Sequence, residues 1–237
     1  MRKYCAVSRS PEYISLESTQ ERSLMQNTLR ARHDLHLIRK AWHMSSGCLG
    51  LAVYHLFNLT EHFVGFALIA FALSGFLFEI IRLRNDKINT LVLKFMGPLM
   101  RKHEKNSCSG LPFYALGVGA SLLLFEKEVA LLGIFFLIFA DPISSLFGIL
   151  YGQNKLIPGK SLEGSMAGFV TCYLLTFVWI ASQTALTGPQ VVLFCIFAGL
   201  IGSISELMSV FADDNLTIPL VSGAGLTILN AIIPIFS

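Results

Sequence analysis

The stretch ALLGIFFLIFADPISSLFGIL, residues 130–150, is an apolar run that contains one charged side chain, Asp141. The run is long enough to cross a bilayer as a helix, which takes about 20 residues. An ionised carboxylate within hydrocarbon costs about 2.5 kcal/mol or more, so an acid that persists there is a candidate functional residue. The stretch PGKSLEGS, residues 158–165, follows with a cation, hydroxyls and a glycine-rich backbone, all of which suit phosphate. The sequence therefore predicts a membrane helix that carries a polar site.

The composition extends the membrane prediction to the whole chain. Of its 237 residues, 54% are hydrophobic and 14% are charged, whereas soluble domains carry about 25% charged residues. A net charge of +3 is too small to indicate nucleic-acid binding, and five scattered cysteines without a CxxC pair argue against a disulfide framework or a zinc site. We expect an all-α, polytopic transmembrane helix bundle of about seven spans, at residues 38–57, 61–81, 111–125, 128–150, 165–186, 189–211 and 215–236.

The charges of the connecting segments predict an orientation. Positive residues precede the first span and fill the segments after the second and the fourth, while the opposite loops carry little net positive charge. The positive-inside rule then places the N-terminus in the cytoplasm and the C-terminus outside.

Residues 86–102 form a different pattern. Apolar residues from Ile88 to Leu99 recur at helical spacing and are flanked by Lys87, Lys94 and Arg101. This pattern predicts an amphipathic helix on the cytoplasmic face of the membrane. It would serve either as an anchor between two spans or as a lateral guide for a lipid substrate.

Four polar clusters, far apart in the chain, all fall on the cytoplasmic side of this topology. A single site requires that they share one side of the membrane. The clusters are Arg39 to His43 at the start of the first span, Asp141 toward the end of the fourth, Lys155 to Ser165 in the next loop, and Glu206 to Asp214 at the end of the sixth.

The helical face that carries Asp141 otherwise holds small or polar residues, Ser144, Ser145, Gly148 and Gly152. Pro142 cannot donate a backbone hydrogen bond, so the helix should kink or restart there. A restart would make Asp141 a helix N-cap. Because Asp141 lies deep in an apolar run, we favour a functional role.

Glu206, Asp213 and Asp214 bring three acids close together in the sequence, next to Asn215. Carboxylates are the ligands that Mg²⁺ prefers, usually shared with substrate phosphates. Two structural interpretations remain open. Glu206 could hydrogen-bond between helices, and the aspartates could lie in a solvated loop with a helix N-cap at Asn215.

Arg39 and His43 are i, i+4 neighbours at the start of the first span, and Lys40 lies beside them. The two cations satisfy the positive-inside rule and could equally contact phosphate. His43 could act as a general base or simply lie at the membrane interface.

The segment from Gly152 to Ser161 looks like a P-loop but has six residues between its glycines, where a P-loop has four. A P-loop also follows a β-strand, whereas a membrane helix precedes this segment. A P-loop NTPase fold is therefore excluded, although the backbone and Lys160 still suit phosphate groups.

Four motifs in order resemble the CTP-dependent lipid kinases, a family that includes dolichol, phytol and CTP-dependent diacylglycerol kinases and is distantly related to phosphatidate cytidylyltransferases. The resemblance covers roughly residues 35–225. The motifs are R-K-x-x-H (Arg39, Lys40, His43), D-P-I-S-S-L-F-G (residues 141–148), G-K-S-L-E-G-S (residues 159–165) and E…D-D-N-L-T-I-P-L (Glu206 and residues 213–220).

The resemblance implies a lipid kinase that transfers phosphate from CTP to a membrane lipid alcohol, such as diacylglycerol, polyprenol, dolichol or phytol, at the cytoplasmic face. Residues 1–34 would form a polar cytosolic leader and residues 35–237 a single transmembrane catalytic domain, with homo-oligomerisation left open. One alternative is a CTP-using lipid cytidylyltransferase, whose own signatures are missing here. The other is a small ion-coupled transporter, in which polar groups would be spread across the membrane depth.

Phosphoryl transfer requires positioning and charge neutralisation, which suggests a role for each conspicuous residue. Asp141, Glu206 or His43 would orient the lipid hydroxyl as the catalytic group. Mg²⁺ would bind Asp141 together with Asp213 or Asp214. The nucleotide would contact Arg39, Lys40, Gly148, Lys155, Gly159, Lys160, Ser161 and Gly164.

Overall fold

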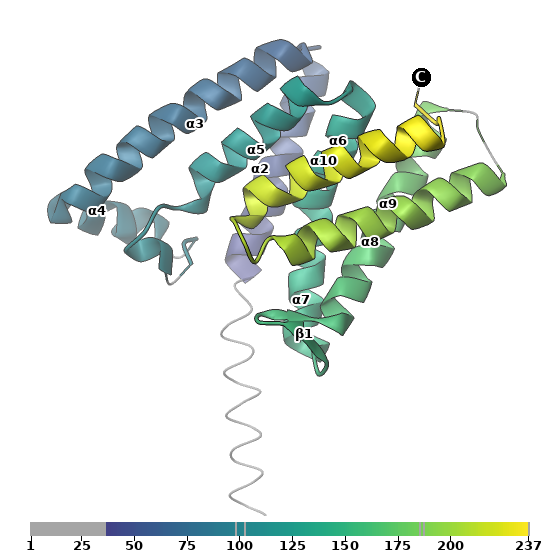
Figure 1. Ribbon diagram of the computed structural model, residues 1–237. Coiled ribbons are helices and arrows are strands. Elements are labelled where there is room, and N and C mark those ends of the chain that lie inside the picture. The colour runs from purple at the N-terminus through teal and green to yellow at the C-terminus, as the bar shows by residue number, and fades with distance from the viewer. Residues whose placement is uncertain (1–36, 98, 102, 185, 187, 237) are drawn as a thin grey trace, which may run out of the picture. The chain divides into compact units, whose positions relative to one another are not determined.

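The computed structural model describes residues 37–236 except 98, 102, 185 and 187, so the predicted leader lies outside the described residues. Helices dominate this part of the chain (Figure 1). In chain order the elements are α2 (Leu37–Leu56), α3 (Glu61–Arg84), α4 (Asp86–Met96), a short 3₁₀ turn (His103–Lys105), α5 (Gly110–Leu124), α6 (Lys127–Phe135), a π-helical turn (Phe136–Ala140), α7 (Asp141–Tyr151), β1 (Lys155–Ile157), β2 (Lys160–Ser161), α8 (Leu162–Gln183), α9 (Pro189–Met208) and α10 (Asp214–Ile232).

Each predicted span corresponds to a helix, and the all-α membrane bundle is confirmed. Within the described part of the chain, five helical segments are long and apolar enough to cross a membrane: α3, Lys127–Tyr151, α8, α9 and α10. Two of the seven predicted spans are outside this set. The 15-residue α5 is shorter than a span, and α2 is outside the set although it has 20 residues. Every window of spanning length in α2 includes Arg39 and Lys40, which lower its hydropathy.

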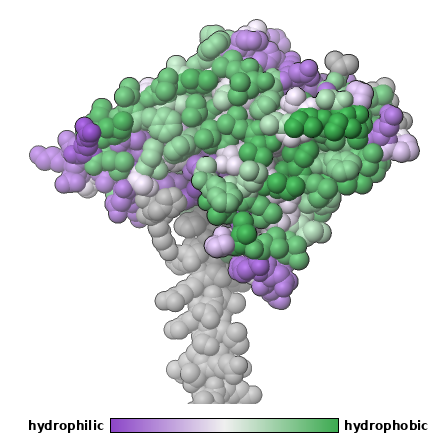
Figure 2. All heavy atoms as spheres, viewed as in Figure 1, coloured by the Kyte–Doolittle hydropathy of each residue, from purple (hydrophilic) through white to green (hydrophobic). Residues whose placement is uncertain are grey.

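The surface agrees with a lipid environment. Large apolar side chains are exposed along α3, for example Phe63, Phe66 and Leu77 at 64%, 63% and 64%. Figure 2 shows a broad hydrophobic face with hydrophilic residues gathered at its margins. Such a surface is too large and apolar for a monomer in water.

The fourth span is one continuous helical segment whose hydrogen-bond register changes before Asp141. The Asp141 N–H donates to the carbonyl of Phe136, five residues earlier, which makes residues 136–140 a π turn. Asp141 and Ala140 both have right-handed helical dihedrals. The predicted restart with Asp141 as N-cap is therefore wrong, because the wide π turn gives Pro142 room without a break in the helix.

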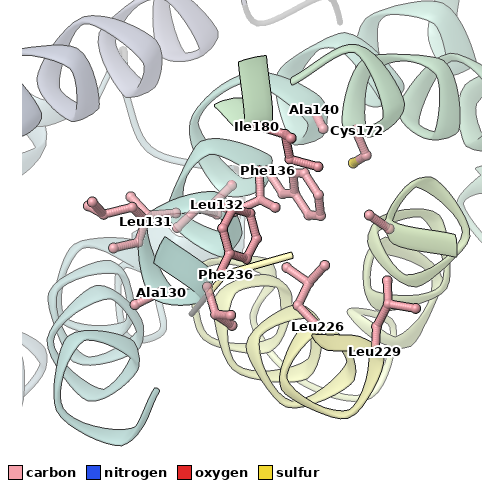
Figure 3. Packing of buried hydrophobic residues seen from close by; sticks show 14 of the residues in the cluster. Ala130, Leu131, Leu132, Phe136, Ala140, Cys172, Ile180, Leu226, Leu229 and Phe236 are labelled. Carbon is pink, nitrogen blue, oxygen red and sulfur yellow. The ribbon is translucent and has the colours of Figure 1, made fainter. Parts of the chain in front are cut away.

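This π turn is the centre of the hydrophobic core (Figure 3). Phe136, Leu137 and Ile138 are at most 1% exposed and pack with residues of α6, α8, α9 and α10. Burial of a large apolar side chain contributes about 1.5–3 kcal/mol. The core therefore holds the backbone next to Asp141 in place.

α7 and α8 approach each other through glycines. A Cβ at Gly164 would lie 2.9 Å from the Ser144 carbonyl oxygen and 3.1 Å from the Gly148 Cα. No residue with a side chain fits there without displacing backbone, so these glycines allow two helices to pack at backbone distance.

The segment between α7 and α8, expected to be a loop, is a small antiparallel hairpin of β1 and β2. Its turn contains Gly159, whose φ of +83° favours glycine. The hairpin projects Lys160 back toward the bundle, since Lys160 pairs with Glu206 of α9.

The amphipathic helix predicted at 86–102 is present as α4, but it ends at Met96. Leu91 and Phe95 are 58% and 71% exposed, as expected for a helix with an apolar face turned outward.

A buried arginine, Arg82, holds the segment that connects α4 to α5. Its guanidinium is fully buried and bonds to Glu79 at 2.6 Å, to Asn89 Oδ1 at 2.7 Å, and to the carbonyls of Glu104, Lys105 and Ser107.

We expect Arg82→Met to destabilise the protein by about 3–5 kcal/mol, because it leaves the buried Glu79 carboxylate without its cation. The double variant Glu79→Gln/Arg82→Met should recover part of this loss. Thermal unfolding in detergent measures both. Arg84→Met, at an exposed position of the same helix, is the control. A single variant as stable as the wild type would contradict a structural role for the pair.

Candidate active site

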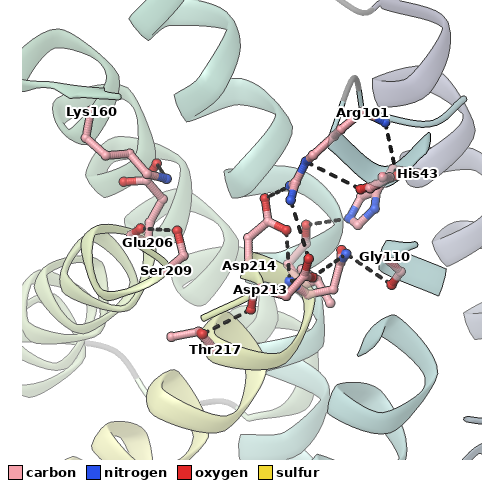
Figure 4. A network of polar contacts seen from close by, with 12 residues as sticks. His43, Arg101, Gly110, Lys160, Glu206, Ser209, Asp213, Asp214 and Thr217 are labelled. Carbon is pink, nitrogen blue, oxygen red and sulfur yellow. Dashed lines mark hydrogen bonds and ion pairs between the residues drawn. The ribbon is translucent and has the colours of Figure 1, made fainter. Parts of the chain in front are cut away.

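Polar residues from separate parts of the chain form a network in which Lys160 meets Glu206 and Arg101 meets Asp213 and Asp214 (Figure 4). The Asp141 carboxylate interacts electrostatically with Asp214, Glu206, Lys160 and Arg101. These partners come from α10, α9, β2 and the segment before α5. Residues of three of the four predicted clusters therefore interact with one another, and their assignment to one site remains a prediction.

An ion pair between Lys160 and Glu206 forms one side of the cluster. It joins the hairpin to α9, and the Glu206 side chain is 7% exposed. The other carboxylate oxygen of Glu206, Oε2, is buried and has no hydrogen-bond partner among the described residues. Since a buried acceptor without a partner is costly, Glu206 is suited to accept a further cation or donor.

A cavity of about 330 Å³ opens beside this ion pair and is here called the basic cavity. It combines the small face predicted on α7 with the whole hairpin. Ser161 also caps α8, accepting a hydrogen bond from the Gly164 N–H at 3.2 Å. A helix N-terminus binds anions through its free N–H groups. The cavity is lined by Ser144, Ser145, Gly148, Ile149, Gly152, Lys155, Gly159, Lys160, Ser161, Gly164 and Glu206.

Arg101 organises the other side of the cluster. Its guanidinium pairs with Asp214 and, at 3.4 Å, with Asp213. Asp213 is also the N-cap of α10, where it accepts from the Asn215 N–H at 3.0 Å and from the Asn215 side chain at 2.8 Å. The predicted cap at Asn215 is thus two residues too late, and the aspartates are not in a solvated loop.

Burial and neighbouring charges shift the pKa values of Asp213 and Arg101. Burial and the neighbouring Asp214 raise the pKa of Asp213 to about 6. Burial disfavours the charged form of Arg101, but Asp214, Asp213 and Glu104 outweigh it and raise the pKa of its guanidinium. A further cation beside Asp213 would favour the ionised form of its carboxylate.

Two cations of α2, Lys40 and Arg39, also interact with the acids of this cluster. The Lys40 ammonium nitrogen is buried without a hydrogen-bond partner in the described part of the chain, and it interacts electrostatically with Asp141. Arg39 interacts with Asp214. A buried ammonium with unused donors is a position where a phosphate group would be stabilised.

His43 has a structural contact that the sequence did not suggest. Its Nε2 lies 3.1 Å from the carbonyl oxygen of Leu137 in the π turn. The amide that would follow Asp141 in the π register belongs to Pro142, which has no N–H. His43 can therefore donate to the carbonyl that Pro142 leaves without a partner, and the neutral ring would then present Nδ1 as an acceptor.

Two sets of residues were missed as parts of a site. Arg101 was interpreted only as a cation of the segment after the second span that flanks the amphipathic helix, because nothing local in the sequence links it to residues 213 and 214. Glu79 and Arg82 lie in an apolar run at i, i+3. That spacing was a usable signal, since charges within a span usually pair.

The acids form no complete metal-ligand set on their own. No group of three His, Cys, Asp or Glu side chains in the described ranges is arranged to hold an ion. Mg²⁺ commonly takes one or two carboxylates and completes its shell with substrate phosphates and water. The donor chemistry of Asp141, Asp213 and Asp214 fits that mode, and their ligation remains a prediction.

Together, the apolar helices and this buried polar cluster define a polytopic membrane protein with a site suited to phosphate groups. The chain belongs to the cytidylyltransferase family, whose model matches residues 9–211.

Individual relatives carry a narrower description. The chain is 32% identical over 202 residues to CTP-dependent diacylglycerol kinase 1 of Schizosaccharomyces pombe, covering 78% of this chain and 88% of the relative. It is 29% identical to the protein of that name from Saccharomyces cerevisiae, over 84% of this chain and 73% of the relative. An uncharacterised Rickettsia prowazekii protein is 28% identical over 79% of this chain and 91% of its own length. No solved structure matches. The resemblance to CTP-dependent lipid kinases is confirmed.

Proposed function

We propose that this protein is a CTP-dependent lipid kinase that phosphorylates the hydroxyl of diacylglycerol at the cytoplasmic face of its membrane. The similarity to CTP-dependent diacylglycerol kinases supports this reaction and does not favour a cytidylyltransferase or a transporter. The observation that carries the proposal is that Asp141 interacts both with Lys160 and Glu206, which line the basic cavity, and with the ion-paired Arg101 and Asp214.

The basic cavity would bind the CTP phosphates. Lys155 and Lys160 supply charge, and Ser161 and the N-terminal turn of α8 supply donors. Gly148 and Gly164 keep the cavity open by admitting no side chain between α7 and α8. Lys40 and Arg39 would approach from α2 and neutralise charge that develops during transfer.

Carboxylates would hold the metal. Asp141 and Asp214, with Asp213, would supply oxygen ligands to Mg²⁺, which in phosphoryl transfer neutralises phosphate charge and orients the groups that react. Arg101 would hold the side chains of Asp213 and Asp214 in position through its ion pairs with them.

The lipid hydroxyl must lose a proton as it attacks the γ-phosphorus. Asp141, Glu206 and His43 remain the candidates to orient or accept it. His43 would do so through Nδ1, because its Nε2 lies against the Leu137 carbonyl. Its bond to the π turn also means that His43 sets the position of α2 beside Asp141.

Phosphate transfer tests the function directly. Purified protein in detergent with Mg²⁺ is given γ-labelled CTP or γ-labelled ATP and a panel of diacylglycerol, polyprenol, dolichol and phytol. We expect label in diacylglycerol from CTP. Parallel reactions with α-labelled CTP and phosphatidate test the cytidylyltransferase alternative. Label from α-labelled CTP alone, or no label in any lipid from a folded sample, would contradict the kinase assignment.

A further inference from the structure

A large apolar cavity lies between α2, α3, α5 and α6 and has no part in the reaction as described so far. Its volume is about 610 Å³, within the range of about 300–1,000 Å³ that small-molecule pockets occupy. The walls are almost entirely hydrocarbon. Its lining includes Leu49, Val53, Leu68, Val118, Leu122 and Ile134.

One end of this apolar cavity adjoins the polar site. A second cavity of about 190 Å³ is lined by Arg39, His43 and Asn215, and by Val92 and Met96 of the amphipathic helix α4. We call it the mixed cavity. The apolar and mixed cavities share three lining residues, Trp42, Ser46 and Tyr114. The two spaces therefore adjoin, and the polarity changes from hydrocarbon to charge between them.

Tyr114 lies at the junction. Its ring contacts His43 edge to face at a centroid distance of 5.0 Å, and a Cβ at Gly47 would come within 2.8 Å of its hydroxyl. Gly47 lines the apolar cavity and His43 lines the mixed cavity, so Tyr114 contacts a wall of each. An occupant of both cavities must carry a long hydrocarbon body and a small polar head.

We propose that the apolar cavity holds one acyl chain of the diacylglycerol substrate, so that the lipid hydroxyl is delivered through the mixed cavity to His43 and Asp141. This inference rests on the proposed function and specifies how its site selects the lipid. It also gives α4 a role as a wall of the path by which the head group enters.

Gly50 offers a substitution that fills this cavity without damaging the fold. It lines the cavity, and a Cβ built there has no atom within 4 Å. Glycine is the least favourable residue in a helix after proline, so Gly50→Phe should not weaken α2. Cys48→Phe is the matched control, because Cys48 is exposed on the same helix and does not line either cavity.

The test compares kcat/KM for dioleoylglycerol and dioctanoylglycerol. We expect Gly50→Phe to lower the long-chain value roughly tenfold more than the short-chain value, with KM for CTP unchanged. Gly50→Leu should have an intermediate effect, and Cys48→Phe should keep the wild-type ratio. An unchanged ratio in Gly50→Phe would overturn the proposal, as would an effect that accompanies a change of oligomeric state, since the cavity would then be a contact between copies.

A binding measurement separates this inference from the kinase assignment. Trp42 lines the cavity, and a Trp179→Phe background removes the other of the two tryptophans. Diacylglycerol brominated on its acyl chains should quench Trp42 fluorescence, and Gly50→Phe should weaken that quenching severalfold. If the wild type phosphorylates no lipid but this quenching is seen, the proposed function fails and the acyl-chain site in the apolar cavity stands. Equal quenching in the wild type and in Gly50→Phe overturns the acyl-chain site, whatever the activity.

Discussion

Asp141→Asn is expected to lower kcat by roughly 10³-fold while the protein remains folded. Asparagine keeps the size of the side chain but removes the negative charge, which would orient the lipid hydroxyl or hold Mg²⁺. The fold should tolerate the change, since Asp141 is not a helix cap and the π turn is fixed by the core around Phe136. Loss of a carboxylate from a group of acids also relieves repulsion with Asp214 and Glu206.

The measurement is single-turnover phosphate transfer from CTP, together with the unfolding temperature in detergent. Asp86→Asn is the control, because Asp86 is an exposed acid at the start of α4. A variant at position 141 that keeps near wild-type kcat would remove Asp141 from the mechanism. Loss of activity together with loss of the folded state would leave the residue a structural one.

Lys160→Ala is expected to have the second-largest effect, with kcat/KM for CTP lowered roughly 10²–10³-fold. Its ammonium lines the basic cavity and pairs with Glu206. The same substitution leaves a buried carboxylate unpaired, so it should also destabilise the protein by about 3–5 kcal/mol.

A double variant separates these two effects. Lys160→Ala/Glu206→Gln removes the unpaired charge and should restore most of the unfolding temperature while activity stays low. Lys155→Ala, at an exposed position of the hairpin that also lines the cavity, should cost less than Lys160→Ala. If the double variant regains activity along with stability, Lys160 serves only to neutralise Glu206 and contributes nothing to CTP binding.

The helices could be predicted closely because hydrophobicity is a local property. Each span is a run of apolar residues that must satisfy its own backbone hydrogen bonds, so its position follows from the sequence. The errors fall where polar residues decide the outcome. Arg39 and Lys40 exclude α2 from the apolar spans, α8 begins earlier than predicted because Ser161 caps it, and α4 ends near Gly97 rather than at residue 102.

The accommodation of Pro142 shows a different limit. The sequence indicates that an α-helical hydrogen bond is lost at Pro142. A helix can accommodate that loss by a kink, by a restart or by a π turn. The structure has the π turn because the core packs on both sides of it and His43 reaches the Leu137 carbonyl. Neither contact can be read from the order of residues around Pro142.

The sequence by itself determined that this is a helical membrane protein, and it determined the residues whose chemistry suits phosphate transfer. Both follow from local composition, since charge within an apolar run is costly and persists only for a reason. Only the tertiary structure decided which charges pair: Lys160 with Glu206, and Arg101 with Asp213 and Asp214. It also decided that the apolar cavity adjoins the mixed cavity, which His43 lines. These features depend on how helices distant in the chain pack together, and packing is set by the whole core rather than by any one segment.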